Sequence, residues 1–266
     1  MYNLIILKLG GSVITRKDST EPEVDYENLD RIAGEIAENT SKHLVIVHGA
    51  GSFGHPFAKK YSIGSLIKSE DDFKDKKKGF CLTQSWVKKL NTIVCDKLRE
   101  KGIFAVSIQP SSFLITKNKR ICSGDLRIIE KYVEMGFVPV IYGDVVLDTD
   151  ESIKTAVLSG DQIIKYLAEN LRAERVILGS DVDGIYTKNP KKYQDAQLIS
   201  VVSSLEDLEL IEGASAVDVT GGMGGKLKEL LILAQNGIES EIINANKPNY
   251  VNKALKGLKG IGTIIK

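Results

Sequence analysis

The stretch Leu4-Ile5-Ile6-Leu7-Lys8-Leu9-Gly10-Gly11-Ser12 decides how this chain begins to fold. It is a short apolar run that ends in two glycines, which is the pattern of a strand buried on both faces of a parallel sheet. Comparable runs follow at residues 43–47, 103–108, 137–142, 175–178 and 241–243. Because helix-period segments separate these runs, the sequence predicts an α/β fold with a mostly parallel sheet covered by helices.

The helices can be placed from their apolar spacing. Leu29, Ile32 and Ile36 recur at helical spacing after Asp25, a residue type that favours the N-cap position. Further helices are expected over residues 85–100, 125–135, 162–170 and 225–236. Three of them are followed by the C′ glycines Gly102, Gly136 and Gly237. Residues 145–157 carry polar turn residues between apolar ones, which predicts a β-hairpin.

The length of 266 residues accommodates one large domain. We expect a single domain over residues 1–266, with approximate lobes 1–158 and 159–266 that share one sheet. The mixed-charge stretch 68–78 is predicted to be a solvated loop or helix face, with a lid as the lesser alternative.

Composition excludes several classes of protein. With 36 basic and 35 acidic residues, the chain has no uniform field to attract nucleic acid or an anionic membrane. Its three cysteines form no CxxC pair, and no apolar stretch reaches the length of about 18 residues that spans a bilayer. We therefore expect a cytoplasmic protein without nucleic-acid or membrane partners.

Glycine-bearing turns follow the first two expected strands. Lys8 stands beside Gly10-Gly11-Ser12, so an ammonium group accompanies a turn that can present backbone amides to an anion. The second turn, His48-Gly49-Ala50-Gly51-Ser52-Phe53-Gly54-His55, formally contains GxGxxG. A dinucleotide site is disfavoured because no acid-ended strand follows about 20 residues later. The turn is instead expected to present amides to a phosphate at a helix start, with His55 as a hydrogen-bond donor; His43 and His48 are expected to be structural.

Three further turns of this kind lie in the second half of the chain. They are Ser159-Gly160-Asp161, the run 179–186, and the run 220–226 that ends in Lys226. The last is not a P-loop, since Thr220 and Leu227 occupy positions that would need Gly and Ser or Thr. Lysines, an aspartate at a helix start and several anion-binding turns together favour phosphoryl transfer, in which positioning and charge neutralisation supply most of the catalysis.

In order and over nearly the whole chain, these motifs resemble the amino acid kinase superfamily. The resemblance rests on Lys8 to Ser12, Gly160-Asp161, Asp181 to Tyr186, and Gly221-Gly222-Met223 through Lys226. The loop from His48 to His55, with Lys17 nearby, is similar to that of the branch that phosphorylates isopentenyl phosphate, a small phosphorylated isoprenoid. The resemblance implies an αβα sandwich, an acceptor lobe followed by a nucleotide lobe, a homodimer, and ATP with magnesium as cofactor.

The resemblance also implies roles for individual residues. The catalytic set would be Lys8, Lys17, His55 and Asp161, with the lysines stabilising the transferring phosphoryl group and Asp161 orienting them. Ala50, His55 and Gly160 would bind the acceptor. ATP would be bound by Lys8, Gly10, Gly11, Ser12, Gly51, Gly179, Asp181, Val182, Asp183, Gly184, Ile185, Tyr186, Gly222 and Lys226. No residue is assigned as a metal ligand.

A phosphate acceptor agrees with the chemistry of these residues. A phosphate monoester is largely dianionic at neutral pH, so it needs no strong general base, only relief of repulsion between two phosphates. Three alternatives stay open: a fosfomycin-type kinase, a nucleoside monophosphate kinase, and a non-catalytic nucleotide-binding protein. The stripe Trp86, Leu90, Ile93 and Val94, preceded by Phe80 and Leu82, would suit either an apolar tail pocket or, more commonly, ordinary core.

Overall fold

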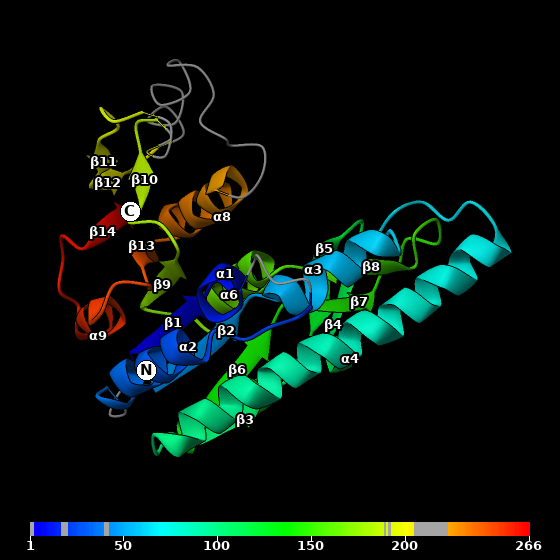
Figure 1. Cartoon of the computed structure of the whole chain (residues 1–266), viewed down its shortest axis with the longest axis horizontal. Helices are drawn as coiled ribbons and strands as arrows, with labels where there is room; N and C mark the ends of the chain where they lie inside the picture. The colour runs from blue at the N-terminus through cyan, green and yellow to red at the C-terminus, as the bar shows by residue number, and fades with distance from the viewer. Residues whose placement is uncertain (1–2, 17–20, 40–42, 189, 191–192, 205–222) are drawn as a thin grey trace.

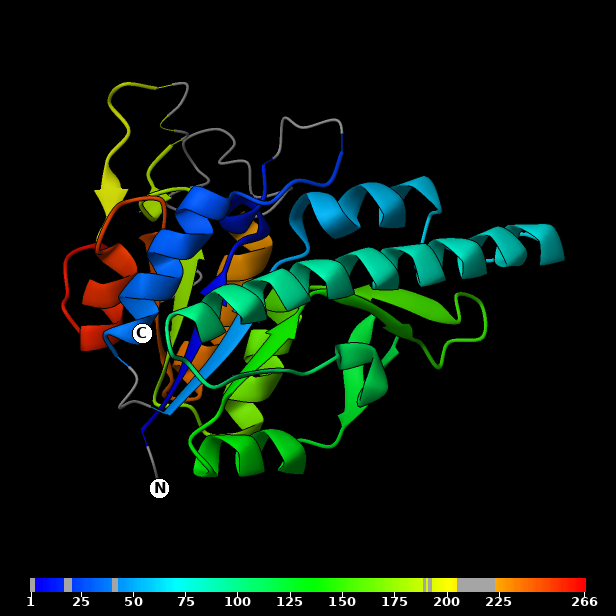
Figure 2. The same cartoon turned by 60° about the horizontal axis from the view of Figure 1, so that its bottom comes forward.

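The computed structural model of the chain is a three-layer sandwich of helices, sheet and helices (Figures 1 and 2). It describes the chain except for residues 1–2, 17–20, 40–42, 189, 191–192 and 205–222. Two hydrophobic clusters, one on each face of the main sheet, form its core. The predicted α/β fold is confirmed.

The main sheet of the described residues has eight strands in the order β12-β14-β13-β9-β1-β2-β6-β3. Its pairings are parallel except that between β13 and β14. The strands are β1 (Leu4–Leu9), β2 (His43–His48), β3 (Ala105–Ser107), β6 (Val138–Tyr142), β9 (Arg175–Ser180), β12 (Val201–Val202), β13 (Glu239–Asn244) and β14 (Gly262–Ile265). Since β1 pairs with β2 on one side and β9 on the other, both halves of the chain contribute to one continuous sheet.

Strand alternation divides the side chains of β1 between the two faces. Leu4 and Ile6 pack in the cluster that includes α5 (Arg127–Glu134), α6 (Gly160–Asn170) and α8 (Met223–Gln235). Ile5, Leu7 and Leu9 pack in the other cluster, whose helices are α1 (Gly11–Ile14), α2 (Tyr26–Ala37), α4 (Glu70–Glu100) and α9 (Tyr250–Lys256). Lys8 belongs by this alternation to the face covered by α6.

The remaining elements extend from the sheet. They are α3 (Gly51–Lys60), a 3-10 turn η1 (Pro110–Ser112), and the strand pairs β4 (Leu114–Lys117) with β5 (Arg120–Gly124), β7 (Asp144–Leu147) with β8 (Thr155–Leu158), and β10 (Ile185–Tyr186) with β11 (Leu198–Ile199). The pair β7–β8 is the hairpin predicted at residues 145–157. The caps are also confirmed: Asp25 accepts a hydrogen bond from the Asn28 amide, and Gly102, Gly136 and Gly237 have φ of 82°, 81° and 77°.

Helix α4 is the main difference from the sequence prediction. It begins at Glu70 rather than near residue 85, so the charged stretch 68–78 is mostly helix, and the helix projects beyond the sheet (Figure 2). Ser69 caps it by accepting a hydrogen bond from the Asp72 amide at 3.2 Å. Within the projecting part Lys76 is 1% exposed and bonds to Asp72 at 2.7 Å, so a core-like position interrupts the charged run.

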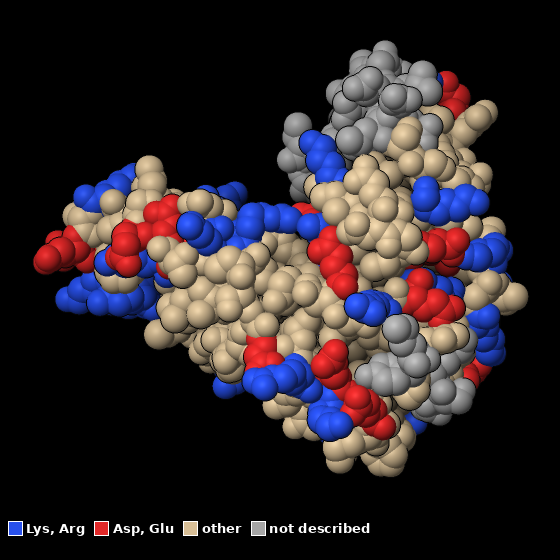
Figure 3. Space-filling view, turned by 180° about the vertical axis from the view of Figure 1, so that it is seen from behind, with Lys and Arg blue, Asp and Glu red and all other residues tan. Residues whose placement is uncertain are grey.

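The surface carries both signs of charge in mixture. In the view of Figure 3, lysines and arginines alternate with acidic residues along the projecting arm and around the body. This view agrees with the net charge of +1. No helix of the described residues is long and apolar enough to cross a membrane.

Candidate active site

A cavity of about 680 Å³ opens where the carboxyl ends of β1, β2 and β9 meet. Its wall includes the turns after these strands and the beginning of α6. Ligands of open α/β sheets bind at this edge, outside the carboxyl ends of parallel strands. Twelve of the described residues that the sequence predicts for the site line this cavity: Lys8, Gly10, Gly11, Ser12, Ala50, Gly51, His55, Gly160, Asp161, Gly179, Asp181 and Lys226.

Lys8 and Asp161 meet in the cavity although 153 positions separate them in the chain. The Lys8 Nζ donates to Asp161 Oδ1 at 2.5 Å, and the Lys8 side chain is 6% exposed. Burial lowers the pKa of Lys8, the nearby Asp161 carboxylate raises it, and the positive charge of Lys226 lowers it. The carboxylate therefore holds a proton on an ammonium group that burial would otherwise discharge.

The start of α6 places the Asp161 carboxylate. Asp161 is not the N-cap of this helix, because Ser159 takes that position and accepts a hydrogen bond from the Gln162 amide at 3.3 Å. Asp161 stands in the first turn, next to Gly160, whose absent Cβ would lie 3.2 Å from Lys8 Cε. The glycine thus lets the lysine approach the helix end closely.

The two glycine turns pack against each other. A Cβ on Gly11 would lie 2.4 Å from the Gly51 nitrogen, and a Cβ on Gly49 would lie 2.6 Å from the Gly11 nitrogen. Thr15 links the turns, since its hydroxyl donates to the Gly11 carbonyl at 2.7 Å and accepts from the Ser52 amide at 3.2 Å. The helices α1 and α3 consequently begin side by side at the cavity.

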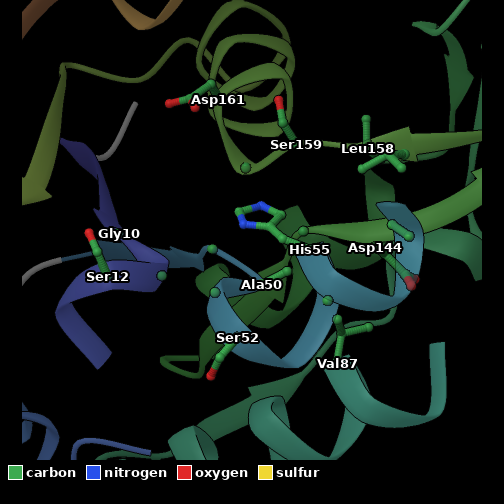
Figure 4. A pocket seen from close by; sticks show the side chains of 18 of the residues that line it. Gly10, Ser12, Ala50, Ser52, His55, Val87, Asp144, Leu158, Ser159 and Asp161 are labelled. Carbon is green, nitrogen blue, oxygen red and sulfur yellow. The ribbon is translucent and has the colours of Figure 1, made fainter. Parts of the chain in front are cut away.

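His55 projects from α3 into the middle of the cavity. Figure 4 shows its imidazole between the α3 backbone and the start of α6, with Ser159 and Asp161 on one side and Asp144 on the other. The ring is open to the cavity, yet the pKa of His55 is lowered by desolvation from the cavity walls and by the charges of Lys8 and Lys226. Near neutral pH it is therefore an uncharged hydrogen-bond donor surrounded by cations.

The second half of the predicted nucleotide motif continues past the cavity. Gly179, Ser180 and Asp181 line the cavity with Lys226 of α8, whereas residues 182–186 are not part of its wall. The Asp183 carboxylate instead accepts hydrogen bonds from Tyr186 Oη and Asn244 Nδ2, both at 2.9 Å.

Gly184 has a φ of 155°, and a Cβ there would lie 2.3 Å from Thr263 Oγ1. The backbone at this position therefore requires glycine, which fixes the turn that follows β9. Lys17 and Gly222 lie outside the described residues.

One end of the cavity is apolar, and the sequence did not identify the residues that form it. Its wall there is made by α3, α4 and the hairpin β7–β8, through Phe57, Ala58, Thr83, Val87, Val145, Val157 and Leu158. In the stripe 86–94, Leu90 and Val94 are fully buried in the core, and Trp86 stacks on Phe57. The stripe is core, as the commoner interpretation held, and the neighbouring positions of α4 face the cavity.

Asp144 also escaped the sequence analysis. It lines the cavity and is 2% exposed, and burial raises the pKa of its carboxyl group. The amides of Ser111 and Val145 donate to it at 3.1 Å and 2.8 Å. Asp144 follows β6 and Gly143, at the end of another strand of the sheet, and this position could have identified it as a site residue.

Comparison with known proteins agrees with this fold. Residues 3–244 match the model of the amino acid kinase family, and the chain belongs to that family. It is 57% identical to the isopentenyl phosphate kinase of Methanothermobacter thermautotrophicus over 98% of both chains, and 38% identical to that of Methanocaldococcus jannaschii over 96% of this chain and 95% of the relative. A solved structure of isopentenyl phosphate kinase superposes with a TM-score of 0.90 at 55% identity, covering 99% of this chain and all of the other.

Proposed function

We propose that this chain is a kinase that transfers the γ-phosphoryl group of ATP to isopentenyl phosphate, giving isopentenyl diphosphate. The observation that carries the proposal is one cavity in which a buried ammonium group, a histidine and two glycine turns adjoin an apolar end. An acceptor with a phosphate head and a short hydrocarbon tail matches both parts of this cavity. The similarity to isopentenyl phosphate kinases supports the same acceptor.

The reaction requires two polyanions to approach each other. An oxygen of the acceptor phosphate attacks the γ-phosphorus, and the bond from that phosphorus to the bridging oxygen breaks, leaving its electron pair on ADP. Lys8 neutralises charge on the group in transit, and Asp161 keeps Lys8 protonated and oriented. Lys17 has the same role by the resemblance alone.

His55 and the turn Gly49-Ala50-Gly51 hold the acceptor phosphate on this proposal. The uncharged imidazole donates one hydrogen bond and adds no positive charge. The start of α3 supplies backbone amides and the positive end of a helix dipole. Gly160 leaves room at the opposite wall. No general base is needed, because the acceptor is already dianionic near neutral pH.

The donor side is formed by the loops after β1 and β9. Gly10, Gly11 and Ser12 cradle the phosphates of ATP, and Gly179, Asp181 and Lys226 face them across the cavity. Magnesium would supply further neutralisation of the ATP phosphates, and it is usually held by phosphate oxygens with one or two carboxylates. Asp161 and Asp181 are the carboxylates that line this side of the cavity.

A panel of acceptors tests the proposal. ADP release is measured with isopentenyl phosphate, isopentenol, fosfomycin and UMP at equal concentrations. We expect release with isopentenyl phosphate and none with isopentenol, which lacks the phosphate. Release with fosfomycin or UMP but not with isopentenyl phosphate would assign a different acceptor, and tight ATP binding without transfer to any acceptor would make the chain a nucleotide-binding protein. A homodimer stays a prediction, for which sedimentation of the purified protein is the measurement.

A further inference from the structure

A chain of polar side chains, buried at its centre, lies behind the acceptor turn, on the side away from the cavity. His48 is the last residue of β2, and strand alternation turns its side chain to the face covered by α4, with Leu44 and Ile46. The ring is fully buried and stacks on Tyr142 with its centroid 5.6 Å away. The proposed reaction does not use this histidine.

The chain runs from Ser107 through Asn91 and His48 to Gly49, and we call it the relay. Ser107 Oγ donates to Asn91 Oδ1 at 2.5 Å, and Asn91 Nδ2 lies 3.1 Å from His48 Nε2 and 3.3 Å from the Val140 carbonyl oxygen. At the other side of the ring, His48 Nδ1 lies 3.0 Å from the Gly49 carbonyl oxygen. Asn91 is 1% exposed and His48 is 0% exposed, so these two central groups have little access to water, whereas Ser107 at the end of the chain is exposed.

Two carbonyl groups, that of Val140 beside Asn91 and that of Gly49 beside His48, determine the positions of the protons on the Asn91 amide and the His48 ring. The Val140 carbonyl only accepts, so the Asn91 group beside it is the NH2, and its second hydrogen points to His48 Nε2. Nε2 must then be the unprotonated nitrogen, and the ring carries its hydrogen on Nδ1, which donates to the Gly49 carbonyl. Burial lowers the pKa of His48 to about 4, in agreement with an uncharged ring.

The bond to Gly49 fixes the orientation of a peptide group that reaches the cavity. In a trans peptide the carbonyl and the following amide point in opposite directions. Holding the Gly49 carbonyl toward the buried ring therefore turns the Ala50 amide away from it, and Ala50 lines the cavity. Among the hydrogen bonds within the described residues, none uses the Ala50 amide.

We propose that His48, held in its Nδ1–H tautomer by Asn91, is a positioning residue that aims the Ala50 amide at the acceptor phosphate. The proposal rests on the proposed function, in which the turn binds that phosphate. Glycine at position 49 is required by its contact with Gly11, and it leaves the peptide without a side chain to restrain it. The hydrogen bond from His48 supplies the missing restraint.

Two substitutions separate positioning from simple packing. His48→Asn places an amide near the Nδ1 position and retains a donor for the Gly49 carbonyl, whereas His48→Gln places its amide near the Nε2 position and loses that donor. We expect His48→Asn to retain kcat/KM for isopentenyl phosphate within about threefold, and His48→Gln to lower it by about 10- to 100-fold through a misplaced acceptor. The KM for ATP stays within about twofold in both, and His43→Gln is the control outside the site.

Equal kcat/KM for the two variants would overturn the proposal, because a packing role does not distinguish them. Long-range proton–nitrogen NMR spectra of the ligand-free wild-type protein give a second measurement, with the His48 signals assigned by elimination from the spectra of His43→Gln and His55→Ala. We expect Nδ1 protonated and Nε2 bare, and the reverse tautomer would overturn the proposal even if a variant fails to fold. This measurement is independent of the acceptor, so a wild-type protein inactive on isopentenyl phosphate would refute the proposed function alone.

Discussion

Replacing Asp161 by Asn removes the charge that offsets the burial of Lys8 while keeping the size of the side chain. Lys8 is 5% exposed, and its pKa is already lowered by burial and by Lys226. Breaking a buried ion pair on one side costs about 3–5 kcal/mol, and Asp161 is 22% exposed, so we take the lower end, about 3 kcal/mol. If that loss falls on the protonated state that catalysis needs, kcat drops by on the order of a hundredfold near neutral pH.

The pH dependence of the variant gives the sharper measurement. A lysine whose pKa falls further loses its proton at lower pH, so acidification restores the charge in Asp161→Asn. We expect its kcat, measured by ADP release from about pH 6 to about pH 9, to rise toward acid more steeply than that of the wild type. Lys8→Ala is the control, with a loss on the order of a hundredfold or more at every pH.

The combination of the two substitutions tests whether the pair acts as a unit. The double variant should be no slower than Lys8→Ala alone, because Asp161 acts through Lys8. A wild-type kcat with an unchanged pH profile in Asp161→Asn would refute the reasoning.

Three other outcomes are expected. Gly11→Ala places a methyl group 2.4 Å from the Gly51 nitrogen, so thermal unfolding should show a free energy of unfolding lower by about 1–3 kcal/mol, and the KM for the acceptor should rise. Gly34→Ala is the matched control: its methyl group meets no atom within 4 Å inside α2, so it should raise the free energy of unfolding by about 0.5–1 kcal/mol. His55→Ala should lower kcat/KM for the acceptor by roughly 10- to 100-fold, because it removes one hydrogen bond to a charged group, and the KM for ATP should stay unchanged. A raised KM for ATP with an unchanged kcat/KM for the acceptor would contradict the placement of His55 at the acceptor.

The third outcome concerns His48. Its pKa is about 4 in the folded protein against an ordinary 6.5, so the stability that its neutral ring contributes is complete above 6.5 and is lost as the pH falls toward 4. The free energy of unfolding, measured with denaturant, should therefore fall between pH 6.5 and pH 4 by roughly 3 kcal/mol more in the wild type than in His48→Asn. An equal fall in the two proteins would contradict this expectation.

Sequence patterns located the strands and their glycine turns because both depend on local residue types. The apolar run 4–9 and the alternation of its side chains suffice to place Lys8 at the end of a strand and on one face of the sheet. The start of α4 was missed because a run of mixed charge resembles a solvated loop. Ser69 followed by three acidic residues was a readable N-cap signal, and with it Thr83 would have been placed with Val87 on the helix that borders the cavity.

Contacts between residues that are distant in the chain could not be predicted from local sequence patterns. Asp183 stays a predicted ATP-binding residue, but its hydrogen bond from Asn244 depends on the pairing of β9 with β13, which no local pattern encodes. Asn91 and His48 are similarly ordinary in sequence, and only the packing of α4 on β2 and β6 brings them together.

The central position of β1 has a consequence for how the two substrates are spaced. The turns after β2 and β9 flank the turn after β1, so the turns that hold acceptor and donor on the proposed function are two strand spacings apart, about 10 Å, with the turn after β1 between them. That separation is set by backbone hydrogen bonds and not by the hinging of one lobe on the other. A change of acceptor preference is therefore expected to need substitutions in α3, α4 and the hairpin β7–β8, which lie outside the eight paired strands and leave the spacing of the turns as it is.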